Sequence, residues 1–305
     1  MPVVKPTLLC IVGPTAIGKT ALSIALAQAF ETEILSADSR QFFKEMYIGT
    51  AVPSQEELQA ATHHFIQNIS IFDTYSVGDF EREALQLLNK LFKIHPVVIM
   101  VGGSGLYVDA VVNGLDDFPD VPLEVRKRLN LEFEEKGMGF LQQELKEQDP
   151  VYFEKVDIQN RQRVIRALEV IRATGKPFSS FRKNKKKQRN FNTLFIGLEA
   201  ERETVYERIE KRVDVMIEEG LLEEAKKLLP YKELNALQTV GYRELFPYFE
   251  GIISLDEAVS EIKKNTRRFA KRQGTWFRKN PDIHWFHYQT DRSEMINFIK
   301  KALSQ

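Results

Sequence analysis

The segment GPTAIGKT, residues 13–20, restricts the possible folds of this chain more than any other feature. It matches the pattern G-x-x-x-x-G-K-[ST], follows the apolar run TLLCIV at residues 7–12, and precedes ALSIALAQAF, which has helical spacing. A strand, a glycine turn and a helix in this order form a phosphate-binding loop, in which backbone N–H groups and the helix N-terminus face an anion. Lys19 is expected to reach the terminal phosphate, and Thr20 to ligate Mg²⁺. The motif predicts a bound phosphate chain and does not specify a nucleotide.

Further apolar runs predict the rest of a sheet. EILSAD at residues 33–38, NTLFIGLEA at 192–200 and IHWFHY at 283–288 are expected as strands, and HPVVIMVGGSGLYVDAVVNG repeats the order of strand, glycine turn and helix. An amphipathic helix is expected over residues 79–94, with Asp79 as its N-terminal cap. Strands that alternate with helices predict an α/β fold, here a P-loop NTPase-like parallel sheet.

A second glycine turn, VGGSGLY, occupies residues 101–107. From about residue 115 the alternation of strands and helices stops. Two highly charged segments, LEVRKRLNLEFEEKGMGFLQQELKEQ and IQNRQRVIRALEVIRATG, have helical patterns instead. We therefore expect a core domain of residues 1–115 and 191–305, interrupted by a helical insertion domain of residues 116–190. Residues 202–229 predict a long helix or a helix pair that Gly220 divides.

The overall charge is balanced, with 43 basic and 43 acidic side chains among 305 residues. A neutral total does not exclude a nucleic-acid partner, because a local basic patch can supply the electric field. One candidate patch is RKNKKKQRN at residues 182–190, for which a solvated loop is the alternative. The other is residues 263–280, where eight basic residues and no acidic one interleave with Phe269, Trp276 and Phe277. Such a stretch suits RNA phosphates and stacked bases, or forms an amphipathic helix with its aromatic residues facing inward.

The single cysteine, Cys10, cannot form an intramolecular disulfide, which fits a reducing cytosol. It lies within the apolar run TLLCIVG and is expected to be an inert core residue. The amino-terminal segment MPVVKPTLLCIVGPT is a poor signal peptide, and the sequence has no run of about 18 apolar residues. We therefore expect a cytoplasmic protein without a membrane span.

Asp38 ends the predicted strand EILSAD, at the edge of an open α/β sheet where ligands gather. It should therefore stand near the phosphate loop. From the pattern alone, Asp38 is a magnesium ligand, a general base or a turn-capping aspartate. Ser39, Arg40 and Gln41 follow it as a polar cluster, in which Arg40 and Gln41 could contact a nucleobase edge or a phosphate.

The turn VGGSGLY at residues 101–107 aims backbone N–H groups at the same edge of the sheet. Ser104 could hydrogen-bond a ligand, although a structural strand–helix turn explains this pattern equally well. The strand before the turn lacks the aspartate that an NTPase often carries there.

Two pairs of arginines share helix faces. Arg163 and Arg166 are three residues apart, and Arg208 and Arg212 are one helical turn apart. The second pair could clamp a diphosphate. The alternative for each pair is a solvated helix face with surface ion pairs.

Seven motifs occur in the order seen in bacterial tRNA dimethylallyltransferases, also called tRNA isopentenyltransferases or the IPP transferase family. They are GPTAIGKT, SADSRQ, GGSGLY, NRQRVIRALEV, RVDVMIEEGL, LQTVGYREL and NTRRFAKRQGTWFR, and the likeness extends from about residue 7 to residue 285. The chain therefore resembles this family over nearly its whole length. Ile17 and Ser104 stand where many members carry Ser and Thr, and neither departure removes a group that the chemistry needs.

The resemblance implies transfer of a dimethylallyl group from dimethylallyl diphosphate to N6 of the adenosine 3′ of the tRNA anticodon, position 37. Diphosphate leaves and N6-isopentenyladenosine forms, so the loop would hold an isoprenoid diphosphate and no ATP would be consumed. Mg²⁺ is the expected cofactor. The tRNA anticodon stem–loop is the expected partner, and the protein is expected to act as a monomer without a membrane.

The resemblance also assigns roles to individual residues. Asp38 is similar to the family's base, while Lys19, Arg212 and Mg²⁺ on Thr20 would stabilise the leaving diphosphate. The residues expected to bind the diphosphate are Gly13, Pro14, Thr15, Ala16, Ile17, Gly18, Lys19 and Thr20. The residues expected to contact the tRNA are Asp38, Ser39, Arg40, Gln41, Ser104, Arg126, Gln162, Arg163, Val164, Ile165, Arg166, Arg267, Lys271 and Arg272.

Three other functions compete with this one. A small-molecule kinase or NTPase would use Asp38 as a magnesium ligand, but it explains neither the basic aromatic stretch nor the missing second acid. A non-catalytic RNA-binding protein would keep a relict loop, which the complete set of Lys19, Thr20 and Asp38 argues against. An adenylate isopentenyltransferase would prenylate free AMP or ATP, whereas the helical insertion and the basic stretch favour a polymer substrate.

Overall fold

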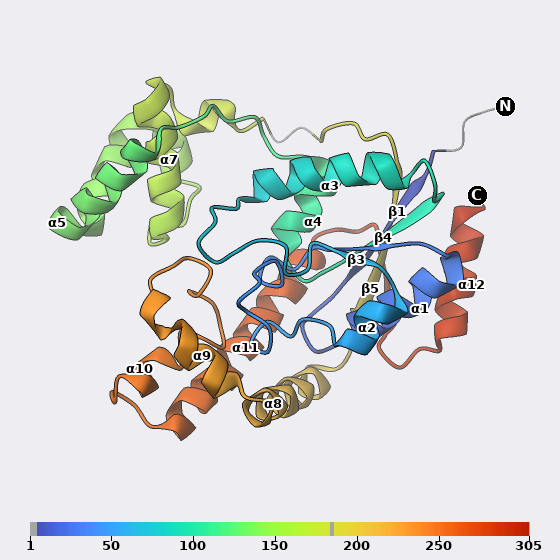
Figure 1. The fold of residues 1–305 in the computed structure, drawn as a ribbon. Helices are drawn as coiled ribbons and strands as arrows, with labels where there is room; N and C mark the ends of the chain where they lie inside the picture. The colour runs from blue at the N-terminus through green and yellow to red at the C-terminus, as the bar shows by residue number, and fades with distance from the viewer. Residues whose placement is uncertain (1–4, 184–185, 305) are drawn as a thin grey trace. The chain divides into compact units, whose positions relative to one another are not determined.

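One parallel sheet organises the larger part of the molecule. The structure is a computed structural model that describes residues 5–183 and 186–304. Its strands are hydrogen-bonded in the order β3-β2-β4-β1-β5-β6, and every pairing is parallel (Figure 1). The strands are β1 (Thr7–Val12), β2 (Ile34–Ser36), β3 (His63–His64), β4 (Val97–Val101), β5 (Asn192–Glu199) and β6 (Ile283–His287). The predicted α/β fold of the P-loop NTPase-like kind is confirmed.

The central strand β1 is buried on both faces, which explains its continuous apolar sequence. Leu9 lies opposite Ile99 of β4 and Leu194 of β5 in the two neighbouring strands. Since all strands are parallel, the carboxyl ends of β1, β2 and β4 meet at one edge of the sheet. The phosphate loop, Asp38 and the second glycine turn follow these three strands, so the topology brings them together.

Helices cover both faces of the sheet. Side chains of α3 and α4 pack with Leu8 and Cys10 on one face, while side chains of α1, α8 and α12 pack with Leu9 and Ile11 on the other. The helices in the part of the chain that contains the sheet are α1 (Lys19–Phe30), α2 (Gln55–Ala60), α3 (Val77–Leu91), α4 (Gly105–Asn113), α8 (Arg202–Glu218), α9 (Leu221–Leu228), α10 (Phe246–Phe249), α11 (Leu255–Phe277) and α12 (Arg292–Leu303), with the short 3-10 helix η2 (Leu229–Tyr231). Cys10 is fully buried, and burial raises the pKa of its thiol, as expected for an inert core residue.

The chain divides into two compact units. The sheet unit comprises Met1–Val112 and Gln188–Gln305, and the helical unit comprises Asn113–Lys187. The helical unit contains α5 (Leu123–Gln148), α6 (Pro150–Phe153), α7 (Arg161–Thr174) and the 3-10 helix η1 (Phe178–Phe181). Its core is formed by apolar side chains such as Leu141 of α5 and Leu168 of α7. The helical character predicted for this segment is therefore present.

Several local expectations change. Asp79 is not the cap of α3, because the cap is Ser76, whose side chain accepts a hydrogen bond from the backbone N–H of Asp79. Asp79 returns a hydrogen bond to the N–H of Ser76, so the two residues form a capping box. Helix α5 is interrupted at Gly137, which has a φ of 76°. Gly220 does separate α8 from α9, as predicted.

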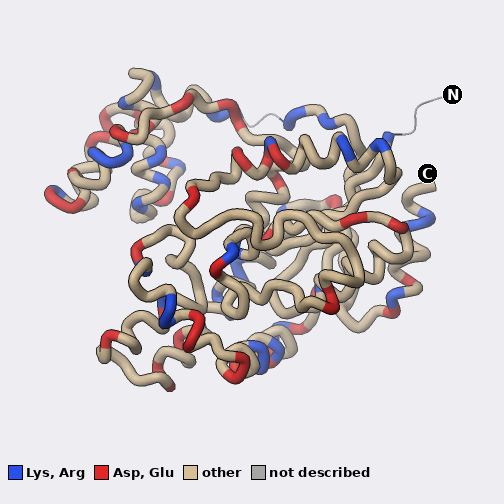
Figure 2. Tube along the Cα trace, viewed as in Figure 1, with Lys and Arg blue, Asp and Glu red and all other residues tan. Residues whose placement is uncertain are grey.

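Basic and acidic residues are interspersed along the helices of each unit (Figure 2). On α11, Lys263 pairs with Asp214 at 2.5 Å, and Arg267 pairs with Glu210. Neighbouring carboxylates therefore neutralise part of the positive charge in residues 263–280.

The basic run at residues 182–190 includes 184–185, which lie outside the described residues. Lys187 pairs with Asp117 at 2.7 Å within the helical unit. Arg189 pairs with Glu81 at 2.8 Å within the sheet unit. No helix of the described residues is both long and apolar enough to cross a membrane.

We predict that Asp149 is a main polar support of the helical unit. Its buried carboxylate accepts hydrogen bonds from the N–H of Tyr152 at 3.0 Å and from the N–H and hydroxyl of Ser179 at 2.7 and 2.8 Å. Asp149→Ala removes the acceptor of both Ser179 donors and the side-chain acceptor of the Tyr152 N–H, so the free energy of unfolding should fall by about 2–4 kcal/mol in urea denaturation followed by circular dichroism. The exposed Asp120→Ala variant is the control, and a loss below about 0.5 kcal/mol in Asp149→Ala would contradict the assignment.

Candidate active site

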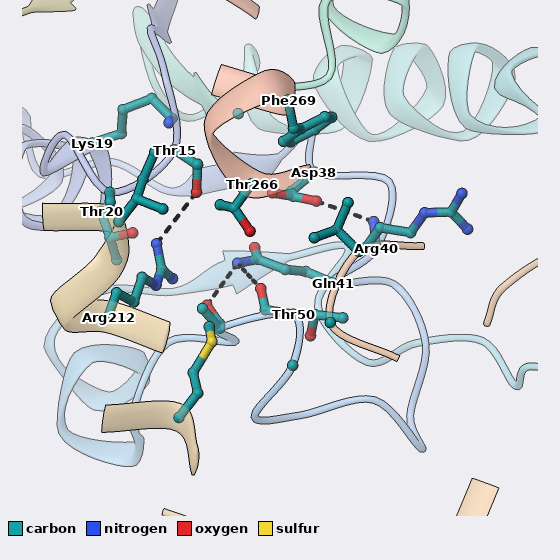
Figure 3. Close-up of a pocket in the computed structure, with 18 of the residues that line it drawn as sticks. Thr15, Lys19, Thr20, Asp38, Arg40, Gln41, Thr50, Arg212, Thr266 and Phe269 are labelled. Atoms are coloured by element: carbon teal, nitrogen blue, oxygen red, sulfur yellow. Dashed lines mark hydrogen bonds between the residues drawn. The ribbon is translucent and has the colours of Figure 1, made fainter. Parts of the chain in front are cut away.

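A cavity of about 820 Å³ opens at the carboxyl edge of the sheet. Figure 3 shows Thr15, Lys19, Thr20 and Arg212 together on one side, with Asp38, Gln41, Thr266 and Phe269 extending the wall beyond them. Residues far apart in the chain thus contribute anion-binding groups and an acid–base group to one space.

The phosphate loop has the conformation that its sequence predicts. Gly18 is left-handed, with a φ of 109°, and α1 begins at the next residue, so the first N–H groups of the helix face the loop. Gly13 has a φ of 141°, and a Cβ atom there would lie 2.5 Å from the carbonyl oxygen of Leu198. Only glycine fits this position. Residues Thr15 to Thr20 line the cavity, whereas Gly13 and Pro14 form the loop's entry from β1.

Two cationic side chains approach the loop. The Nζ of Lys19 donates a hydrogen bond to the carbonyl of Pro14 at 2.7 Å, and Arg212 contacts the hydroxyl of Thr15 at 3.5 Å. Burial lowers the pKa of Lys19 to about 8, against the opposing field of the Asp38 carboxylate, and the charge of Arg212 lowers it further. Burial also lowers the pKa of Arg212, again opposed by Asp38. A bound anion would relieve the unfavourable burial of both charges.

Arg208 lies beside Arg212 and is bonded to the phosphate loop. Its Nε donates to the carbonyl of Ala16 at 2.7 Å, and its guanidinium lies over the ring of Tyr288, 5.1 Å from the ring centroid. Arg208 therefore holds the backbone of the phosphate loop, and both arginines line the cavity.

Asp38 lies at the cavity wall, two residues after the end of β2. Its backbone N–H donates to the hydroxyl of Ser36 at 3.3 Å, and its Oδ1 accepts from the N–H of Arg40 at 3.1 Å. The main chain of Ala37 also packs closely on the second glycine turn, because a Cβ atom at Gly102 would lie 2.5 Å from it. The orientation of Asp38 therefore depends on its backbone surroundings.

Gln41 and Arg40, which could have contacted a nucleobase, are bonded within the protein. The amide of Gln41 accepts from the Ser36 hydroxyl at 3.1 Å and donates to the carbonyl of Ala51 at 2.8 Å. The guanidinium of Arg40 donates to the carbonyls of Asn235 and Ala236, each at 3.2 Å, and extends away from the phosphate loop (Figure 3). Both side chains fasten loops of the cavity wall in the structure.

The carboxylate of Glu224 supports the loop of the cavity wall around Gly49. Glu224 accepts hydrogen bonds from the backbone N–H groups of Tyr47, Ile48 and Gly49 at 2.9–3.1 Å. It also accepts from the hydroxyl of the fully buried Tyr242 at 2.6 Å. The motif LQTVGYREL thus supplies a support for the loop around Gly49, and its residues Gln238 to Gly241 line the cavity.

Ser104 reaches the cavity through the second glycine turn. Its hydroxyl accepts from the N–H of Ser39 at 3.2 Å and lies 3.2 Å from the Ser39 hydroxyl. The two serines that the resemblance grouped as tRNA contacts are therefore neighbours beside Asp38.

Helix α11 contributes Thr266, Phe269 and Arg272 to the cavity. Phe269 is 36% exposed, and the guanidinium of Arg272 lies over its ring at 5.7 Å. Arg267 and Lys271 of the same helix do not line the cavity. Of the three aromatic residues in this stretch only Phe277 is buried, so the aromatic residues do not all face inward. Thr266 was not predicted from the sequence, although the motif NTRRFAKRQGTWFR contains it.

The remaining predicted tRNA contacts lie in the helical unit. Arg126 and Arg166 both pair with the buried Glu169, at 3.2 and 3.3 Å. Arg126 also donates to the side chain of Gln162 at 2.7 Å, and Arg163 is exposed on the same helix, α7.

Val164 and Ile165 differ from these polar neighbours, because both side chains are fully buried in the core of the helical unit. Their helical positions turn them inward, so the expectation that their side chains contact tRNA is not supported. We assign both residues to the core.

The donor set for a metal is small. Within the described residues, no group of three or more His, Cys, Asp or Glu side chains could hold an ion. The hydroxyl of Thr20, in the first turn of α1, is the donor that a phosphate loop offers to Mg²⁺. These residues fit an ion that takes most of its oxygen ligands from a bound diphosphate and water.

Sheet topology and the conformation of the loop at residues 13–20 define an α/β protein of the P-loop kind. The model of a family described as IPP transferase matches residues 41–280. The tRNA dimethylallyltransferase of Christiangramia forsetii is 59% identical over 297 residues, which are 97% of this chain and 98% of the relative. That of Flavobacterium johnsoniae is 58% identical over 302 residues, with coverages of 97% and 98%.

Solved structures agree. The full-length tRNA isopentenylpyrophosphate transferase from Bacillus halodurans has a TM-score of 0.73 and 37% identity, over 98% of this chain and 97% of that one. A eukaryotic dimethylallyltransferase acting on tRNA has a TM-score of 0.80 and 28% identity, over 98% of this chain and 78% of that one. The chain belongs to the IPP transferase family, and the resemblance carried by the seven motifs is confirmed.

We predict that anion binding weakens at alkaline pH because Lys19 loses its charge. With a pKa of about 8, Lys19 is mostly charged below that pH and mostly neutral above it. The dissociation constant for pyrophosphate, measured by calorimetry, should therefore rise above about pH 8, by at most about tenfold per pH unit. Lys19→Arg keeps its charge throughout this range and should lack the rise. The same pH profile in both proteins would contradict the role of Lys19.

Proposed function

We propose that this protein transfers the dimethylallyl group of dimethylallyl diphosphate to N6 of the adenosine 3′ of the tRNA anticodon. The observation that carries the proposal is one cavity lined by both the phosphate loop and Asp38. Relatives named tRNA dimethylallyltransferase, of almost the same length as this chain, support tRNA as the acceptor.

The reaction needs a base beside a leaving group. The N6 amine of adenine is a weak nucleophile, because its lone pair is delocalised into the ring. As the bond between N6 and C1 of the dimethylallyl group forms, the bond between C1 and the diphosphate oxygen breaks. The Asp38 carboxylate takes the proton that leaves N6, and diphosphate departs. Asp38 suits this role because it reaches the cavity, its backbone N–H is held by the Ser36 hydroxyl, and its carboxylate is held by the backbone N–H of Arg40.

The leaving diphosphate gains negative charge as the bond breaks. The N–H groups at the start of α1, together with the side chains of Lys19 and Arg212, would stabilise that charge. The Thr20 hydroxyl would hold Mg²⁺, which neutralises diphosphate charge when bound. The loop of residues 13–20 would therefore bind an isoprenoid diphosphate.

The acceptor adenosine must leave its stack to reach this cavity, at a cost of a few kcal/mol. Phe269 offers an exposed aromatic face for stacking, and the Ser39–Ser104 pair offers hydroxyl groups for a base edge. Gln162, Arg163 and Arg166 of the helical unit would contact the anticodon stem–loop through phosphates. Further proposed contacts to the tRNA are Arg126, Arg267, Lys271 and Arg272. The protein would act as a monomer on one tRNA molecule.

A phosphate loop also favours a second candidate, a kinase or NTPase. Strand β4 ends at Val101 and is followed by Gly102 and Gly103. The end of this strand therefore carries no acid where an NTPase often holds its second magnesium ligand. ATP hydrolysis without prenyl transfer would support this candidate over ours.

We predict that Asp38→Asn abolishes transfer and retains diphosphate binding. The amide keeps the size of Asp38 and can still accept from the N–H of Arg40, but it cannot take the proton. The rate of label transfer from dimethylallyl diphosphate to an anticodon stem–loop RNA should fall by about 10²–10⁴-fold, with the dissociation constant for pyrophosphate little changed. The exposed Asp282→Asn variant is the control. Full transfer activity in Asp38→Asn would remove Asp38 as the base.

A further inference from the structure

Gln273 is a buried polar residue on α11, a helix that lines the cavity with other side chains. It is 5% exposed, whereas the flanking Arg272 and Gly274 are not buried. A buried amide costs free energy unless both of its ends are hydrogen-bonded. Its partners therefore show what the residue holds in place.

Both ends of the Gln273 amide bind the backbone of elements that form the site. Oε1 accepts from the N–H of Thr15 in the phosphate loop at 2.9 Å, and Nε2 donates to the carbonyl of Gly103 at 3.1 Å. The chemistry of the partners fixes the orientation, because an N–H needs an acceptor and a carbonyl needs a donor. One side chain thus bridges the phosphate loop, the second glycine turn and α11.

The second glycine turn is shaped to receive this helix. A Cβ atom at Gly103 would lie 2.1 Å from Nε2 of Gln273, and one at Gly105 would lie 2.2 Å from the indole of Trp276. The indole N–H of Trp276, one helical turn beyond Gln273 on α11, donates to Asp109 of α4 at 3.0 Å and extends the same contact. The motifs GGSGLY and NTRRFAKRQGTWFR are therefore two sides of one packing contact.

The hydrogen bond to Thr15 restrains a different group of the phosphate loop from those that Lys19 and Arg208 hold. Lys19 bonds the carbonyl of Pro14 and Arg208 bonds the carbonyl of Ala16, so these cations hold loop acceptors. Gln273 holds a loop N–H group, which an unrestrained loop could turn elsewhere. As a neutral amide, it does so without adding charge to the anion site.

We propose that Gln273 is a positioning residue that fixes the phosphate loop against α11 and so sets the affinity for the diphosphate. This inference rests on the proposed function and deepens it. The same helix presents Thr266, Phe269 and Arg272 to the cavity, so Gln273 also sets the spacing between the diphosphate site and the acceptor wall. Gln273 touches neither the diphosphate nor the adenosine, and acts through the backbone of Thr15 and Gly103.

The test uses Gln273→Met, which keeps the length of the side chain and removes both hydrogen bonds. We expect the KM for dimethylallyl diphosphate and the dissociation constant for pyrophosphate to rise by about 10–100-fold, with RNA affinity within about twofold of the parent protein. The exposed Gln289→Met variant is the matched control and should behave like the parent protein.

Gly103→Ala perturbs the same contact from the opposite side, since its Cβ would displace the Gln273 amide. It should raise the KM and the dissociation constant in the same direction, which keeps the proposal testable if Gln273→Met folds poorly. Variants that lower only the melting temperature, with unchanged KM and pyrophosphate affinity well below it, would overturn the proposal. Pyrophosphate binding separates this failure from that of the proposed function, because it does not depend on prenyl transfer.

Discussion

Two cations, Lys19 and Arg212, line one cavity with the carboxylate of Asp38. The other residues of the site are arranged around these three charges. Burial disfavours both positive charges, while the field of Asp38 favours them. The ammonium group of Lys19 donates a hydrogen bond to the carbonyl of Pro14. A diphosphate would supply the negative charge that the cavity lacks and would leave Asp38 available as a base.

Several polar residues in and around this cavity hold backbone in place. Gln41 joins Ser36 to the loop at Ala51, and Glu224 supports the neighbouring loop through the N–H groups of residues 47–49. Arg208 and Gln273 fasten the phosphate loop itself. A rigid wall of this kind keeps donors and base in fixed positions, as electrostatic catalysis requires.

The sequence predicted the elements that depend on local pattern. The loop of residues 13–20 and the strands around it follow from apolar runs and glycine spacing. The sequence did not predict the strand β3 (His63–His64) or the helix α2 (Gln55–Ala60), because both are too short to show periodicity. Asp79 was misplaced by one turn, since a capping box puts an acidic residue three positions after the cap.

The site was predictable in outline and not in its hydrogen bonds. Strand order alone brings the loop, Asp38 and the second glycine turn to one edge of the sheet. The partners of Arg40 are main-chain carbonyls about 195 residues away along the chain, and no local pattern announces them. Val164 and Ile165 were grouped with their polar neighbours by motif, although the helical period turns them into the core.

The most direct measurement offers labelled dimethylallyl diphosphate and Mg²⁺ to the purified protein with three acceptors in parallel: an anticodon stem–loop RNA with adenosines after the anticodon, AMP and ATP. We expect label on N6 of an adenosine in the RNA, released pyrophosphate, and no label on AMP or ATP. Label on the free nucleotides would contradict the polymer acceptor. ATP hydrolysis without any transfer would contradict the role assigned to the phosphate loop.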